Sequence, residues 1–307
     1  MKIHNTNKKK FLITIAGPTA VGKTSLCIDI AKNLNCEIFS CDSRQVYKEM
    51  SIGTAKPTTE ELESTTHHFI DHLSIHDHYS AGHFERDFDQ KILAYFQEND
   101  IAILTGGTGM YIKAAQEGLD NFPDIDEATK QKVRQIFEDG GIDSLADNLR
   151  QYDPTYALSV DLKNKRRLTR ALEVCIQTGN PFSEYLNKKS KIIDFECINI
   201  CLTRPRENLY NRINQRVDTM MKEGLEEEAR ALYIHKGIKA LDTVGYRELF
   251  SYFDGEYSKE RAIELIKQNT RRYAKRQMTW FKNQGAWKMI QATELDEIHQ
   301  YINTSIS

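Results

Sequence analysis

The sequence predicts an α/β fold: a P-loop-type parallel sheet flanked by helices, with an all-helical insertion domain and a helical C-terminal region. Three observations lead to this prediction. The apolar run at 11–16 leads directly into a glycine-rich turn and a helical pattern, and the run at 101–105 repeats the arrangement. Between about 119 and 195 no convincing strand pattern is found. Alternating strands and helices are typical of parallel sheets, whose carboxyl ends line one site.

The first elements form a βαβ unit. A buried strand is expected at 11–16, a helix from about Lys23 to Asn35, and a second strand in "EIFSCDS" at 37–43. The run "DIAILTGGTGMYIKAA" then gives a further strand that leads through glycines into a helix. Its glycine loop should lie beside the first loop, because parallel strands end at the same edge of the sheet.

The composition changes after Gly118, where helical periodicity replaces the strand pattern. The sequence therefore predicts a P-loop core of 1–118 and 196–307, with C-terminal helices, interrupted by a helical insertion at 119–195.

After the insertion, strand character returns in "ECINICLT" at 196–203. Two long helices are predicted next, one at 204–233 and one at 258–283 with a dense basic face. Cys197 and Cys201 share one face of the returning strand and are expected in the core.

Length and composition indicate a globular protein and argue against a disulfide-rich or membrane-spanning one. A chain of 307 residues with 40% hydrophobic content can bury a full core. Its net charge of −2 gives no global basic field, so any nucleic-acid contact must be local. The six cysteines include no CxxC pair, and no leader or membrane span is evident. We expect a reduced, cytoplasmic protein that acts as a monomer and has no membrane partner.

The stretch "GPTAVGKT" fits the phosphate-binding pattern G-x-x-x-x-G-K-[ST], and it follows a strand and opens a helix. Glycines allow the turn, backbone amides point at an anion, Lys23 neutralises its charge, and the Thr24 hydroxyl can ligate Mg²⁺. The alternative is a chance match on an ordinary turn. The predicted phosphate-binding residues are Gly17, Pro18, Thr19, Ala20, Val21, Gly22, Lys23 and Thr24.

The acidic residue that ATP hydrolysis needs at a neighbouring strand end is missing, since "IAILT" runs into Thr105 and glycines. Asp42, at the carboxyl end of the second strand, could instead accept a proton from a nucleophile. The alternative is a helix cap or a magnesium-shell aspartate. Thr108 offers a hydroxyl near the same sheet edge. Arg212 and Arg216, four residues apart on one helical face, could clamp a leaving diphosphate or form a solvated salt-bridging face.

Eight segments together resemble the family of tRNA dimethylallyltransferases, the bacterial tRNA isopentenyltransferases. They are "GPTAVGKT", "CDSRQVYKEMSIGTAKP", "HHFIDHL", "YSAGHFERD", "TGGTGMYIKA", "KRRLTRALEV", "VGYREL" and "TRRYAKRQMTWF". The match covers nearly the whole chain, and ordinary P-loop kinases lack the second and fifth segments. Such enzymes transfer the dimethylallyl group of dimethylallyl diphosphate to N6 of the adenosine 3′-adjacent to the anticodon, position 37, and use Mg²⁺. Alkyl transfer needs a stabilised leaving diphosphate and no water-activating acid.

The resemblance also implies residue roles. Asp42 matches the general base, Arg216 the catalytic arginine, Lys23 and the rest of the loop the diphosphate site, and Thr108 a catalytic-site threonine that contacts tRNA. The implied tRNA contacts are Asp42, Ser43, Arg44, Gln45, Thr108, Arg166, Arg167, Leu168, Thr169, Arg170, Gly245, Tyr246, Arg247, Arg272, Lys275 and Arg276. The resemblance thus implies that the insertion at 119–195 contacts the tRNA anticodon stem-loop. The basic residues of the insertion and of the last long helix would bind RNA phosphates; the alternative is two solvated helix faces.

Two other functions fit parts of the sequence. A P-loop nucleoside or small-metabolite kinase would bind ATP in the loop and use the insertion as a lid. A non-catalytic RNA-binding protein would use the loop as a phosphate clamp. The missing base-recognition motifs argue against the first, and Asp42 beside an intact Gly-Lys-Thr argues against the second.

Overall fold

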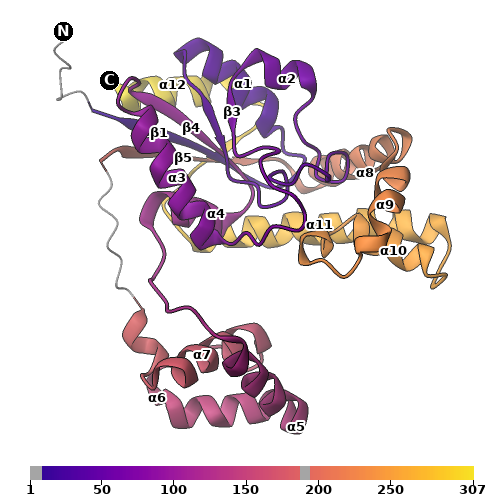
Figure 1. Ribbon diagram of the computed structural model, residues 1–307. Coiled ribbons are helices and arrows are strands. Elements are labelled where there is room, and N and C mark those ends of the chain that lie inside the picture. The colour runs from indigo at the N-terminus through magenta and orange to yellow at the C-terminus, as the bar shows by residue number, and fades with distance from the viewer. Residues whose placement is uncertain (1–8, 187–193) are drawn as a thin grey trace. The chain divides into compact units, whose positions relative to one another are not determined.

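A computed structural model describes residues 9–186 and 194–307 (Figure 1). The chain forms two compact units, one of Met1–Gln116 with Ile193–Ser307 and one of Glu117–Ile192. The boundaries predicted from the sequence, at 118/119 and 195/196, lie within three residues of these. Parts of both predicted domains, 1–8 and 187–193, are outside the described residues.

The larger unit is built on a single parallel sheet, which confirms the predicted fold class. Within the described residues the sheet has six strands, in the spatial order β3-β2-β4-β1-β5-β6. In chain order they are β1 (Phe11–Ala16), β2 (Ile38–Ser40), β3 (His67–His68), β4 (Ile101–Gly106), β5 (Glu196–Thr203) and β6 (Lys288–Gln291). All six run parallel, so their carboxyl ends meet at one edge.

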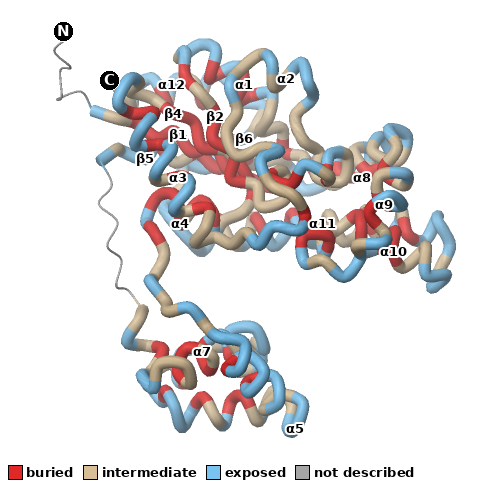
Figure 2. The backbone as a smooth tube through the Cα atoms, viewed as in Figure 1, coloured by how far each residue is buried: buried red, intermediate tan, exposed pale blue. Residues whose placement is uncertain are grey.

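Helices cover both faces of this sheet (Figure 1). The described helices of the larger unit are α1 (Lys23–Leu34), α2 (Thr59–Ser64), α3 (Ala81–Tyr95), α4 (Gly109–Glu117), α8 (Arg206–Lys222), α9 (Leu225–Leu232), α10 (Tyr246–Phe253), α11 (Lys259–Asn283) and α12 (Leu295–Ile306), with 3-10 turns η2 (Tyr233–His235) and η3 (Lys239–Leu241). Of these, α9 and α10 pack against α8 and α11 to the side of the sheet. One buried cluster joins β1 and β5 to α1, α8 and α12, and a second joins α8 to α11 with the segment around Tyr47. Figure 2 shows the strands as the most buried part of the unit.

Two sequence predictions in this unit are wrong. The segment 204–233 is two helices rather than one, because Gly224 adopts a left-handed conformation at φ 103° between α8 and α9. Cys201 is buried as expected, but Cys197 is exposed, because the first two residues of β5 lie outside the core. Strands β3 and β6, of two and four residues, were not predicted; they are too short to give a periodic pattern.

The smaller unit is all-helical in its described residues, as predicted. It consists of α5 (Glu127–Tyr152), α6 (Pro154–Ala157), α7 (Lys165–Thr178) and the 3-10 turn η1 (Phe182–Tyr185). Its own core includes Leu145, Leu149 and Leu172. The buried Asp153 accepts hydrogen bonds from the backbone N of Tyr156 at 2.9 Å and of Ser183 at 2.6 Å, so it ties α6 to η1.

The predicted RNA-binding stretch lies on α7. One side of this helix packs into the core of the smaller unit. Leu168 is fully buried there, so its assignment as a tRNA contact is corrected: it is a core residue. Arg166, Arg167 and Arg170 are exposed on the same helix. Among the described residues of both units, no helix combines the length and apolarity needed to cross a membrane.

Candidate active site

The glycine-rich loop connects β1 to α1 at the carboxyl edge of the sheet. A Cβ at Gly17 would lie 2.9 Å from the carbonyl oxygen of Leu202 on β5, and Gly22 has φ 112°, so both positions favour glycine. No side chain caps the start of α1 at Gly22. The first amides of α1 are therefore available to an anion at this end of the helix.

Lys23 is positioned to neutralise that anion. Its Nζ donates hydrogen bonds to the carbonyl oxygens of Gly17 and Pro18, each at 3.0 Å. Burial lowers the pKa of Lys23 to about 8, and the Asp42 carboxylate partly offsets this shift. A bound phosphate would stabilise the charged form of Lys23, which its surroundings otherwise disfavour.

Arginines that follow β5 border the same loop. Arg212 Nε donates to the Ala20 carbonyl at 2.8 Å, and Arg216 donates to the Thr19 hydroxyl at 3.5 Å and to the Ala55 carbonyl at 3.4 Å. Arg204, which the sequence analysis missed, donates to the Val21 carbonyl at 2.7 Å. Burial lowers the pKa of Arg216, opposed by nearby Asp42. The predicted pair thus contacts the loop and is not merely a solvated helix face.

Asp42 and Thr108 come together although 65 residues separate Ser43 from Thr108. Thr108 Oγ1 accepts a hydrogen bond from the Ser43 backbone N at 3.2 Å. Asp42 Oδ1 accepts from the backbone N of Arg44 at 2.8 Å and of Gln45 at 3.3 Å, so one carboxylate oxygen caps the turn after β2. The nearby Asp42 carboxylate also raises the pKa of Lys23 and of Arg216, against the effect of burial. This places a carboxylate and a hydroxyl on the same side of the site as the loop.

Helix α11 contributes two side chains that the sequence analysis did not assign to the site. Tyr273 is 36% exposed; the desolvation that remains raises its pKa to about 12, nearby Asp42 acts in the same direction, and an interaction with the Thr108 hydroxyl opposes both. Gln277 is 6% exposed; its Oε1 accepts from the Thr19 backbone N at 2.9 Å and its Nε2 donates to the Gly107 carbonyl at 3.0 Å. In the sequence, Gln277 stands out only as an uncharged amide within the basic stretch "KRQMTWF".

The remaining predicted tRNA contacts divide into exposed and buried residues. Arg272, Lys275 and Arg276 are exposed on α11, as is Arg247 on α10. Arg44 is half-buried and donates to the carbonyl oxygens of Ala240 at 3.0 Å and Asp242 at 3.4 Å.

Two assignments near α10 are corrected. Tyr246 is fully buried and its hydroxyl donates to Glu228 Oε1 at 2.7 Å, while buried Gly245 donates its backbone N to Glu248 Oε2 at 2.8 Å. Their side of α10 packs into the second cluster, so neither residue presents a surface to RNA.

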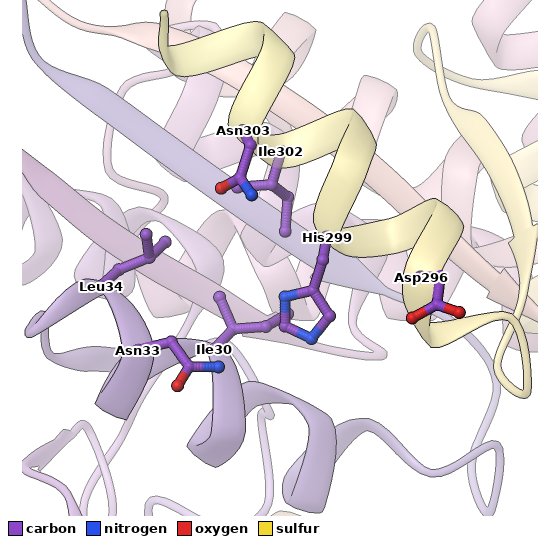
Figure 3. A pocket seen from close by; sticks show the side chains of 7 residues that line it. All are labelled: Ile30, Asn33, Leu34, Asp296, His299, Ile302 and Asn303. Atoms are coloured by element: carbon purple, nitrogen blue, oxygen red, sulfur yellow. The ribbon is translucent and has the colours of Figure 1, made fainter.

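A separate pocket of about 460 Å³ lies between α1 and α12, lined by residues that include Asn33, Asp296 and His299 (Figure 3). Leu34, which also lines it, is the last residue of α1, whereas Lys23 is the first. Ile30, on the same helix, is the lining residue nearest to the loop, so at a rise of 1.5 Å per residue the pocket begins roughly 10 Å along α1 from Lys23. It contains none of the predicted site residues and is not the active site.

Comparison with known proteins decides the family. The family model described as IPP transferase matches residues 45–284, well over half of the chain. The chain belongs to the IPP transferase family. A protein of Christiangramia forsetii named tRNA dimethylallyltransferase is 50% identical over 298 residues, covering 97% of this chain and 99% of that protein.

Solved structures of this family have the same fold. The full-length tRNA isopentenylpyrophosphate transferase of Bacillus halodurans is 37% identical, with a TM-score of 0.71 and coverage of 97% of both chains. A eukaryotic dimethylallyltransferase captured acting on tRNA is 28% identical, with a TM-score of 0.79, 97% coverage of this chain and 77% of that one. These relatives do not favour the P-loop kinase alternative.

Proposed function

We propose that this protein transfers a dimethylallyl group from dimethylallyl diphosphate to N6 of the adenosine 3′-adjacent to the anticodon, position 37 of tRNA, and releases diphosphate. The named relatives support this activity. The observation that carries it is the meeting of a cationic phosphate loop with Asp42 and Thr108 at one edge of the sheet. A leaving-group site and a proton acceptor are the two parts that N-alkylation requires.

The donor diphosphate binds in the loop from Gly17 to Thr24. The free amides of α1, Lys23 and Arg216 stabilise the negative charge that grows on the diphosphate as the carbon–oxygen bond breaks. The half-buried Thr24 hydroxyl at the start of α1 is an oxygen ligand of the kind that Mg²⁺ accepts beside phosphate oxygens. When bound there, Mg²⁺ supplies further charge neutralisation of the leaving group.

On the acceptor side, Asp42 takes the proton from the N6 amine and Thr108 helps to hold the base. The target adenosine must leave the anticodon-loop stack to reach the donor. The exposed arginines and lysine of α7 and α11 would bind phosphates of the anticodon stem-loop. All the contacts described for the chemical site come from the larger unit, so the proposal needs no residue from a second chain.

A label-transfer assay tests the proposal. An unmodified tRNA is incubated with Mg²⁺ and dimethylallyl diphosphate labelled in the prenyl group; a matched tRNA carries guanosine at position 37. The expected result is prenyl label in the first RNA only, with one diphosphate released per group transferred. Equal labelling of both RNAs would contradict the acceptor position, and no labelling of either would contradict the activity.

A further inference from the structure

Gln277 is one of the few buried polar residues described in the larger unit. The oxygen and the nitrogen of its side-chain amide each form a hydrogen bond with a different loop. Oε1 accepts from the backbone N of Thr19 in the diphosphate loop, and Nε2 donates to the carbonyl of Gly107 in the loop before α4. These loops leave different strands, β1 and β4, so a single side chain fixes the spacing between them.

The close fit at the second loop shows how tightly α11 approaches it. A Cβ at Gly107 would lie 2.1 Å from Gln277 Nε2, and one at Gly109 would lie 2.3 Å from the ring of Trp280. Gln277 and Trp280 are three residues apart and therefore lie on one side of α11. The glycines that flank Thr108 are thus required by α11 side chains packed directly against this loop.

Both bonded loops carry groups of the proposed reaction. Thr19, whose amide bonds Gln277, also accepts a hydrogen bond from Arg216 through its hydroxyl. Gly107 immediately precedes Thr108, whose hydroxyl accepts from Ser43 beside Asp42. Gln277 therefore stands between the leaving-group side and the acceptor side.

We propose that Gln277 is a positioning residue that sets the distance between the diphosphate loop and the Thr108 loop, and that links both to the basic outer side of α11. This rests on the proposed function. Misplacement of reacting groups by about 1 Å can reduce a rate by about a hundredfold. An uncharged amide suits the task, because it both donates and accepts without adding charge beside Lys23 and Arg216.

Two substitutions test the two hydrogen bonds of Gln277. Gln277→Met keeps the length of the side chain and removes both bonds. Gln277→Glu retains an acceptor for the Thr19 amide but replaces the donor to Gly107 with a second acceptor, which repels the carbonyl. We expect Gln277→Met to weaken inorganic diphosphate binding about tenfold and to slow single-turnover prenyl transfer at least tenfold. Gln277→Glu should slow transfer at least as much, and the charge that it adds beside Lys23 and Arg216 should also weaken diphosphate binding.

A matched control comes from Gln116, another buried glutamine of the same unit. Its Nε2 donates to Thr14 Oγ1 and Asn199 Oδ1, both at 2.6 Å, away from the two loops. Gln116→Met should lower the melting temperature as Gln277→Met does, yet leave diphosphate binding and the transfer rate within about twofold of wild type.

Calorimetric titration with inorganic diphosphate and Mg²⁺, a rapid-quench transfer assay and thermal melts are run on all four proteins. Wild-type values for both Gln277 variants would overturn the proposal, and so would equal losses in Gln116→Met at an equal drop in melting temperature. Should Gln277→Met not fold, a Gln277→Glu variant with an unimpaired transfer rate still contradicts the role of the Gly107 bond. Failure of the wild-type protein to transfer the prenyl group would instead count against the proposed function, while diphosphate binding would still report on the loop.

Discussion

The Gly17–Thr24 loop is one contiguous stretch of chain to which distant side chains add hydrogen bonds, whereas Asp42 and Thr108 belong to separate segments that only the fold brings together. In the loop, left-handed backbone at Ala20 and Gly22 and the start of α1 create the anion site within eight residues. On the acceptor side, Ser43 bonds Thr108 and Gln277 braces the neighbouring Gly107. We infer that substitutions in the two regions should separate leaving-group binding from acceptor chemistry.

The largest effect is expected at Asp42. Asp42→Asn keeps an oxygen acceptor for the amides of Arg44 and Gln45 but removes the base, so turnover should fall about a hundredfold or more. Affinity for tRNA should stay within a few-fold of wild type. Steady-state kinetics and filter binding measure these two quantities. Asp42→Ala, which also removes the turn cap, should lose similar activity and additionally lower the melting temperature. Turnover of the Asn variant near wild type would remove Asp42 from the chemistry.

Arg216 should come next. Its guanidinium contacts the Thr19 hydroxyl and is partly buried, whereas Arg212 is exposed and reaches only the Ala20 carbonyl among the contacts described. Arg216→Ala should therefore slow the single-turnover rate about thirtyfold to a hundredfold, because the leaving diphosphate needs the arginine most as it gains charge. Arg212→Ala should slow it less than tenfold. The reverse order of the two variants would assign the catalytic role to Arg212.

A smaller effect is expected on the RNA side. Replacing Arg272, Lys275 and Arg276 together should weaken tRNA binding about tenfold and reduce the logarithmic salt slope by about two, given roughly 0.7 to 0.9 for each lost phosphate contact. The triple replacement of Arg166, Arg167 and Arg170 in the insertion tests the same idea in the other unit. Binding of dimethylallyl diphosphate should stay near wild type in both. Filter binding of tRNA across a salt series measures the slope. An unchanged slope in both variants would contradict the proposal that these basic residues bind RNA phosphates.

The pH dependence of donor binding gives the most modest effect. Because the pKa of Lys23 is lowered to about 8, its ammonium is charged below that pH and is lost as the pH rises through it. Affinity for dimethylallyl diphosphate should therefore fall above pH 8, by at most about tenfold per pH unit. Lys23→Arg keeps a charge that does not titrate in this range, so its affinity should not show this fall. Identical pH profiles for the two proteins would contradict the role of Lys23 as the titrating group.

The same lowered pKa affects folding with the opposite sign. The unfolded chain, with a lysine pKa near 10.5, binds more protons than the folded chain between about pH 8 and 10.5. The contribution of Lys23 to the free energy of unfolding therefore rises with pH across that window. Replacing Lys23 with Met should remove this rise in chemical unfolding experiments.

The contrast between the two regions also explains what the sequence could predict. The loop, the strand before it and α1 are contiguous, so spacing alone predicts their geometry. Gln277, Arg204 and the buried state of Tyr246 depend on which distant segments pack together, and no local pattern contains that information. Leu168 shows the same limit inside a motif: the basic stretch on α7 was assigned to RNA as a whole, although the amphipathic helix turns this residue into the core.

The most direct test of the central claim asks whether the Gly17–Thr24 loop binds dimethylallyl diphosphate or ATP. Calorimetric titrations of dimethylallyl diphosphate and of ATP are run with Mg²⁺ and a tRNA stem-loop carrying guanosine at position 37, which blocks turnover. Wild type and Lys23→Met are compared. The account predicts that dimethylallyl diphosphate binds at least tenfold more tightly than ATP and that Lys23→Met largely removes this binding. Tighter binding of ATP, equally dependent on Lys23, would contradict the account and restore the kinase alternative.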